Sequence, residues 1–168
     1  SLDQVAGAFS LAITNKWAKA SSESPLVEGQ RCELRVDDAV LVSGYIDEVE
    51  SAYSGADRSF RVDGRSRAGD LVDCSAEHAT GAWVDVPALQ IAKDLCSPFG
   101  VAVTSEVTLE GAVKKFAVEP GESVFDALER LARLAGVVVS GSPAGDVILT
   151  RAGTARAGTQ LELGVNVL

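Results

Sequence analysis

The stretch Phe60-Arg-Val-Asp-Gly-Arg-Ser-Arg-Ala-Gly-Asp-Leu-Val-Asp-Cys-Ser-Ala76 marks a change of pattern in the chain. In its first half, apolar residues and a glycine alternate with charged residues, which is the period of a half-buried β-strand. The alternation is lost near Ser66, and residues 68–72 predict a short helical turn instead. The stretch therefore predicts the boundary between a β part and a part that mixes helices and strands.

The residues before this boundary predict an antiparallel sheet. Period-2 alternation marks four strands, at 5–14, 31–36, 40–49 and 60–65. Asp37-Asp38 is a tight-turn candidate, and Gly44 marks either a bulge or a close approach of two backbones. Four consecutive strands with short turns favour a sheet that curls or closes into a barrel. We expect an incomplete barrel-like domain over 1–65, completed by a C-terminal strand at 161–168.

The residues after the boundary predict an α+β arrangement. We expect a linker over 66–113, with a helix at 87–97 and short strands, and then a compact β-α-β-β unit over 114–152. The helix of that unit has a capping-box spacing at its start and a glycine at its end, from Ser123, Asp126 and Gly136. The expected fold class is α+β: an antiparallel β-barrel-like domain followed by small α+β domains.

Composition restricts the function. The 168 residues carry 24 acidic and 15 basic side chains, a net charge of −9. Clamping a nucleic-acid backbone needs a positive surface, so this chain is a poor match to that role. No apolar run approaches the roughly 18 residues of a membrane helix, so we expect no membrane insertion. The chain contains no Met and opens on a strand pattern, which favours a piece of a longer protein.

Three groups of residues have reactive side chains without the spacing that chemistry needs. Cys74 and His78 lie four apart, but the signatures that surround a catalytic Cys are absent. Asp70 and Asp73, with a third aspartate nearby, lack the pattern of a calcium loop. The segment 64–69 lacks the Lys and Ser or Thr of a phosphate-binding loop. The three Cys have no regular spacing and predict buried thiols. We therefore expect no enzyme, no cofactor and no metal site.

The motif at 60–76 resembles the baseplate hub proteins (tail protein P family) of Mu-type contractile-tailed phages and related prophages. In that family a strand ending in V-x-G-R-S is followed by D-L-V-D-C-S-A, which here are residues 62–66 and 70–76. The family's strand G-Y-[VI]-D-x-V corresponds to residues 44–49. Further similarity covers 89–92, 98–100, 116–136 and 149–153, so the resemblance extends over nearly the whole chain.

The resemblance implies a virion structural protein of the phage tail baseplate, made in the bacterial cytoplasm. Hub proteins of this kind carry two barrel-like domains in each subunit and form a trimeric ring that joins the tail tube to the central spike. The chain would then be a fragment of a longer two-barrel hub protein. The implied partners are other copies of the chain, the tail tube protein, the central spike protein and other baseplate proteins. Phage DNA would pass through the ring without specific binding, and an acidic lumen would suit the net charge of −9.

A second interpretation comes from residues 116–125. Phe-Ala-Val-Glu-Pro-Gly-Glu-Ser-Val-Phe resembles the start of a LysM module, in which a strand, a P-G-[DE]-[ST] turn and a helix follow one another. Such modules bind N-acetylglucosamine polymers. The alternative function is therefore a LysM-like, peptidoglycan-binding module of a tail-associated protein. Residues 137–149 depart from that pattern, because they predict a hairpin where a LysM module has a helix and then a strand.

Five residues are candidates for an interface. Arg65, Arg67 and Asp70 lie where the β part ends, and we expect them to form salt bridges between sections or between subunits. Trp17 and Trp83 fall in predicted loops. A loop Trp is either a plug in the core or an apolar anchor at an interface, because interfaces are enriched in Trp and Arg.

Overall fold

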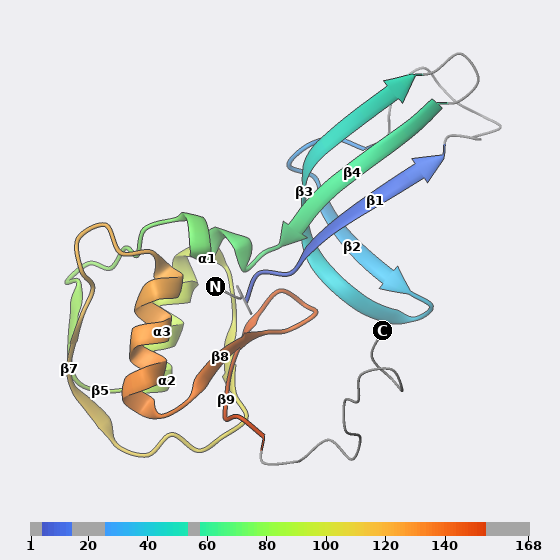
Figure 1. Ribbon diagram of the computed structural model, residues 1–168. Coiled ribbons are helices and arrows are strands. Elements are labelled where there is room, and N and C mark those ends of the chain that lie inside the picture. Colours follow the sequence, from blue (N-terminus) through green and yellow to red (C-terminus); the bar gives the residue numbers. More distant parts are fainter. Residues whose placement is uncertain (1–4, 15–25, 54–57, 154–168) are drawn as a thin grey trace, which may run out of the picture.

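The computed structural model describes residues 5–14, 26–53 and 58–153, and it places them in two parts that join at the end of β4 (Figure 1). The first part is one antiparallel sheet with the strand order β1-β4-β3-β2. Its strands are β1 (Ala8–Thr14), β2 (Arg31–Val36), β3 (Ala39–Tyr53) and β4 (Arg58–Ser66). The four strands that alternation predicts are all present, and β3 extends beyond its predicted end.

The sheet is open within the described residues, in keeping with the expected incomplete, barrel-like domain. Among the described residues, β1 and β2 are each paired along one edge, and the other edge is free. The predicted closing strand at 161–168 lies outside the described residues.

Two local features of the sheet match the sequence. Asp37 has a φ of 52° in the turn between β2 and β3, as the tight-turn prediction requires. Gly44 is a point of close approach. The pairing of β3 with β2 shifts register opposite Leu34 and Arg35, and a bulge of β3 against β4 lies between Ile46 and Glu48. The bulge bends β3 and increases its twist at this point.

The second part is a mixed α+β unit. Its helices are α1 (Gly69–Asp73), α2 (Ala88–Cys96) and α3 (Val124–Ala135), with a short 3-10 helix, η1 (Ser97–Phe99). Its strands are β5 (Ala82–Pro87), β6 (Val103–Ser105), β7 (Ala112–Ala117), β8 (Val138–Gly141) and β9 (Val147–Thr150). The Ser123 hydroxyl accepts a hydrogen bond from the Asp126 N–H at 3.1 Å, and Gly136 follows α3 with a φ of 66°. The predicted caps of α3 are thus confirmed.

The strands of this part pair across the expected division at 113/114. β5 pairs with β7, and β6 pairs in parallel with β9, which also pairs with β8. Helices α2 and α3 pack against each other between these two sheets (Figure 1). Among the described residues, one hydrophobic core includes Val5, before β1, and residues between Ala68 and Leu149, such as Leu95 on α2 and Leu128 on α3. Residues 66–113 are therefore part of a packed unit, unlike the expected linker, because their apolar side chains complete its core.

Candidate functional site at the joint between the two parts

The joint begins where β3 and β4 approach each other closely. A Cβ atom on Gly44 would lie 1.9 Å from the Arg65 carbonyl oxygen, so a glycine is required there. Ser66, the last residue of β4, is 5% exposed. Its N–H donates to the Gly7 carbonyl oxygen at 2.7 Å, and its hydroxyl accepts from the Gly7 N–H at 3.2 Å. These bonds fix the direction in which the chain leaves the sheet.

Arg65 connects β4 to β3 and to α1. Its guanidinium lies 3.1 Å from the Asp47 carboxylate on β3, and it donates a hydrogen bond to the Asp73 carboxylate at the end of α1. The hydrogen bond with Asp73 is the main reason why the pKa of Arg65 is raised. All three side chains are more than a third exposed, so these pairs orient α1 and add at most about 1 kcal/mol each.

Arg67 holds the turn between β8 and β9 against the sheet. Its Nη2 donates to Asp146 Oδ1 at 2.7 Å and to the Ala144 carbonyl oxygen at 3.3 Å. The Ser43 N–H on β3 donates to the Pro143 carbonyl oxygen at 2.9 Å, and the Ser43 carbonyl oxygen accepts from the Arg67 N–H at 3.2 Å. The turn over residues 142–146 is thus docked against Ser43 of β3 and against Arg67, just after β4, and it joins the two parts.

We expect Asp146→Ala to loosen this joint. Asp146 Oδ1 also accepts from the Ala102 N–H at 3.2 Å, and Arg67 Nε already lacks a hydrogen-bond partner within the described residues. Removing the carboxylate leaves a partly buried cation unpaired, so the free energy of unfolding should fall by about 2–3 kcal/mol in urea titrations. Glu33→Ala breaks the exposed pair with Arg35 and should cost less than about 0.5 kcal/mol. Equal effects of the two substitutions would contradict this role of Asp146.

Trp83 lies inside the second part, on strand β5 and not in a loop. Its side chain is 5% exposed, and its indole N–H donates to Asp94 Oδ2 on α2 at 2.9 Å. The His78 ring stacks on it with 4.3 Å between ring centroids, and Phe116 on β7 lies 5.9 Å away. Of the two expected roles, core plug or interface anchor, Trp83 has the first: its side chain fills the core of its own chain.

Arg130 on α3 closes the same end of the core. Its guanidinium lies 4.4 Å from the centre of the Phe116 ring and donates to both Glu122 carboxylate oxygens, at 2.9 and 2.7 Å. It also donates to the Ala117 carbonyl oxygen at 2.7 Å. Hydrogen bonding to Arg130 is the main reason why the pKa of Glu122 is lowered, and a bond from the Glu119 N–H adds to it. The pair fixes the turn before α3.

The lowered pKa of Glu122 predicts a pH-dependent contribution to stability. A carboxyl group with a depressed folded-state pKa contributes fully above its unfolded pKa, and the contribution is lost as the pH falls through the folded-state value. That value lies below the ordinary 4.5. Glu122→Gln should therefore lower the free energy of unfolding at pH 7 by about 1–2 kcal/mol, and the difference should vanish in acid. Urea titrations from pH 7 to pH 2 measure it, and a constant difference would refute the assignment.

The three cysteines differ in how far they are buried. Cys74 is exposed, which corrects the expected buried thiol, and Cys32 is half-buried. Cys96 is buried, and burial raises its pKa to about 12. His78 Nδ1 contacts the Thr80 hydroxyl at 3.1 Å. Across the described ranges, no three His, Cys, Asp or Glu side chains are placed to hold a metal ion, and no helix is long and apolar enough to cross a membrane.

Two of the five predicted interface residues meet at the joint. Arg65 and Arg67 both bridge the sheet to the second part, whereas Asp70, on α1, has no ion pair in the described part of the chain. Trp83 packs internally, and Trp17 lies outside the described residues. Sequence reasoning missed the partners Asp47 and Asp146, because each belongs to a segment far along the chain.

Family models match both parts of the chain. A model described as "Mu phage baseplate assembly protein GpP-like, N-terminal" matches residues 1–66. A model described as "Baseplate hub protein gp44-like, second domain" matches residues 68–151. These matches confirm the resemblance indicated by the motif at 60–76, and their boundary falls at the joint.

Individual relatives agree with the family models. Baseplate hub protein gp44 of Escherichia phage Mu is 32% identical over 171 residues, which cover 100% of this chain and 44% of that protein. The 43 kDa tail protein of prophage MuSo2 from Shewanella oneidensis has a TM-score of 0.82 and 30% identity, covering 96% of this chain and 50% of that one.

The tail protein of Neisseria meningitidis is a further structural match. It has a TM-score of 0.73 and 28% identity, covering 86% of this chain and 42% of that one. The chain therefore spans about half the length of these relatives. None of these matches favours a LysM module.

Proposed function

Because the chain belongs to the family of Mu-type baseplate hub proteins, we propose that it is a structural subunit of a ring in a phage tail baseplate. The match to both family models, one on each side of the joint, is the observation that carries this proposal. The role is structural and not enzymatic. It would place the protein in the virion, after synthesis in the bacterial cytoplasm.

The open sheet supports a ring-building role. Among the residues that the structure describes, the outer edges of β1 and β2 have no strand beside them, and such edges pair readily with another strand. We propose that the segment 161–168 adds one strand, as the sequence predicts, and that further strands come from other subunits or from the rest of a longer chain. A closed ring needs a head-to-tail interface, for which unlike edges are suited.

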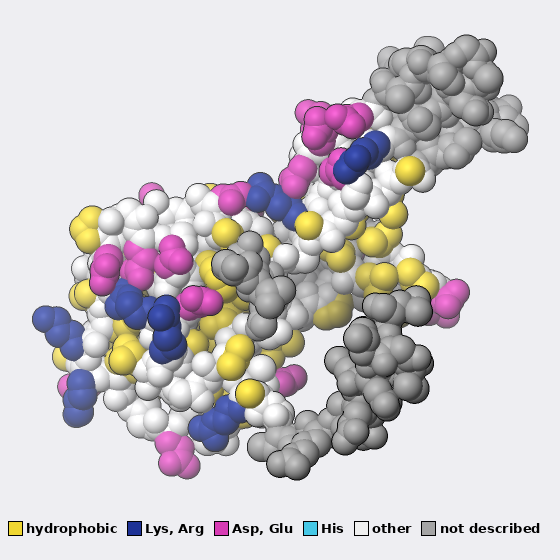
Figure 2. All heavy atoms as spheres, viewed as in Figure 1, with side chains coloured by type: hydrophobic (Ala, Val, Ile, Leu, Met, Phe, Trp, Pro, Cys, Tyr) yellow, Lys and Arg dark blue, Asp and Glu magenta, His cyan; other side chains and the backbone are white. Residues whose placement is uncertain are grey.

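The proposed ring would join the tail tube protein to the central spike protein and contact other baseplate proteins, with three copies of the chain as its subunits. DNA would leave through its lumen. Carboxylates gather on the sheet (Figure 2), where Asp47, Glu48 and Glu50 of β3 are exposed. Like charges repel the DNA backbone, so an acidic wall would let DNA pass without binding it.

Molar mass tests the ring directly. Light scattering of the natural, full-length protein over a range of concentrations should give three times the mass of one chain. A full-length protein that stays monomeric at every concentration would refute the ring.

A further inference from the structure

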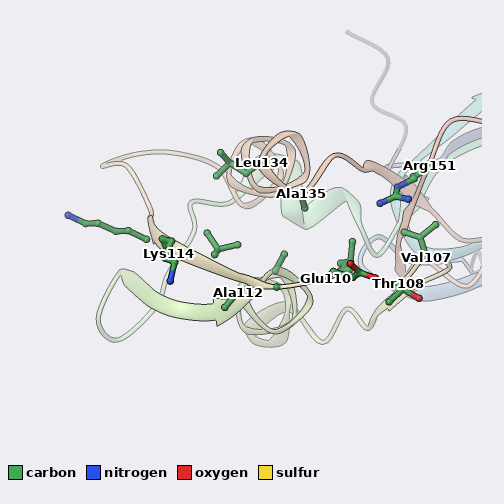
Figure 3. A pocket seen from close by; sticks show the side chains of 13 residues that line it. Val107, Thr108, Glu110, Ala112, Lys114, Leu134, Ala135 and Arg151 are labelled. Atoms are coloured by element: carbon green, nitrogen blue, oxygen red, sulfur yellow. The ribbon is translucent and has the colours of Figure 1, made fainter.

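A groove of about 790 Å³ lies beside β7, on the second part and away from the joint (Figure 3). We call it the β7 groove. Residues 112–115 of β7 and the loop 107–111 form one side, and Leu134 and Ala135 at the end of α3 form the other. Arg151, after β9, lies at one end of the groove.

The strand in this groove has an unused edge. β7 pairs with β5 in a two-stranded sheet, so within the described residues its second edge has no strand beside it. An open edge of this kind binds an extended peptide as an added strand, through backbone hydrogen bonds. The groove supplies the space that such a strand needs, next to the residues that would pair with it.

The charge of the groove is opposite to that of the protein. Three cations, Lys114, Lys115 and Arg151, line it against one carboxylate, Glu110, although the whole chain has a net charge of −9. Lys114 is paired with Asp85 at 3.1 Å. Lys115 and Arg151 have no ion pair in the described part of the chain, so both are available to a carboxylate.

Apolar side chains line the same space. Leu134, at the end of α3, is 64% exposed. Val113 on β7 is half-buried, and so are Val107 and Leu109 on the loop. A segment that fits the groove therefore needs apolar side chains as well as carboxylates.

We propose that the β7 groove binds an extended segment of a partner protein that pairs with the open edge of β7 and alternates carboxylates with apolar side chains. Its carboxylates face Lys115 and Arg151, and its apolar side chains cover Leu134. Because the segment is an added strand, two adjacent prolines prevent its binding, since at least one of them falls at a position whose N–H would pair with β7. This binding needs neither a ring nor a tail, so its failure would leave the proposed function unaffected.

Fluorescence anisotropy with three labelled ten-residue peptides tests the groove. One alternates Glu with Val, the second alternates Lys with Val, and the third replaces two adjacent central residues of the first, one Glu and one Val, with Pro. The Glu peptide should bind at least about tenfold more tightly than either of the others at low salt. The double variant Lys115→Glu, Arg151→Glu should lose about tenfold in affinity, whereas Lys93→Glu, on the exposed face of α2, should not change it.

Several results would overturn the proposal. Equal binding of the Glu and Lys peptides would remove the charge argument, and equal binding of the Pro peptide would remove strand addition. Unchanged affinity in the double variant would place the peptide elsewhere. Circular dichroism serves to check that each variant is folded. Light scattering covers a further outcome: self-association that the double variant abolishes would make the occupant a second copy of this chain, and not a separate partner.

Discussion

Gly44→Ala should unfold the four-stranded sheet or come close to it. The added Cβ would lie 1.9 Å from the Arg65 carbonyl oxygen and 2.7 Å from the Ser66 Cα, and both atoms belong to backbone that cannot rotate away. Overpacking against a flexible side chain costs typically 1–3 kcal/mol, and a collision with backbone costs more. We expect a loss of at least about 3 kcal/mol in urea unfolding, with loss of amide protection in β3 and β4.

Gly7→Ala is the matched control for this prediction. A Cβ on Gly7 would meet Val42 Cγ2 at 3.8 Å, which is ordinary van der Waals contact. This variant should unfold within about 0.5 kcal/mol of the natural chain. A Gly44→Ala protein as stable as the Gly7→Ala protein would show that β3 and β4 do not approach as described.

Leu95→Ala should destabilise the whole second part, including strands that follow it by more than 40 residues. Leu95 on α2 is fully buried in the core that also contains Leu128 on α3 and Leu149 on β9. Truncating a buried Leu costs about 2–5 kcal/mol, depending on how far the cavity collapses. Hydrogen exchange should therefore accelerate in β8 and β9 as much as in α2.

Leu134→Ala is the control, because Leu134 lies on α3 but is 64% exposed. It should change the free energy of unfolding by less than about 0.5 kcal/mol. If residues 66–113 were a linker beside an independent unit, Leu95→Ala would leave amide protection in β8 and β9 unchanged. That result would contradict the single core.

Local patterns predicted the elements whose signals lie within one segment. Alternation located the strands of the sheet, and Ser123 with Gly136 located the ends of α3, because caps act on adjacent backbone. Strand β5 was missed. In it Trp83 is buried while Val84 is 65% exposed, so hydrophobicity does not alternate as it does in a half-buried strand. The parallel pairing of β6 with β9 joins residues 44 positions apart, such as Val103 and Val147, and no local pattern encodes it.

The sequence indicated the cations of the joint but not their partners. Arg65 and Arg67 stood out as cations at the boundary, and both do bridge the two parts. Their partners could not be chosen from the sequence, because Asp146 is 79 positions from Arg67 and lies among many carboxylates. The glycine at position 145 is a trace of this docking in the sequence. In the structure its φ of 80° and its closeness to the Ser43 carbonyl oxygen both require glycine. A glycine in a hairpin turn has several explanations, so the docking of this turn became visible only in the fold.

The central claim is that this chain is part of the baseplate, and its position in the virus particle tests that claim most directly. Electron microscopy of particles from the phage or prophage that encodes it, labelled with a gold-conjugated antibody to residues 68–151, measures that position. We predict label at the end of the tail away from the head, where tube and spike meet. Label on the head, or particles without label while the cells contain the protein, would contradict the account.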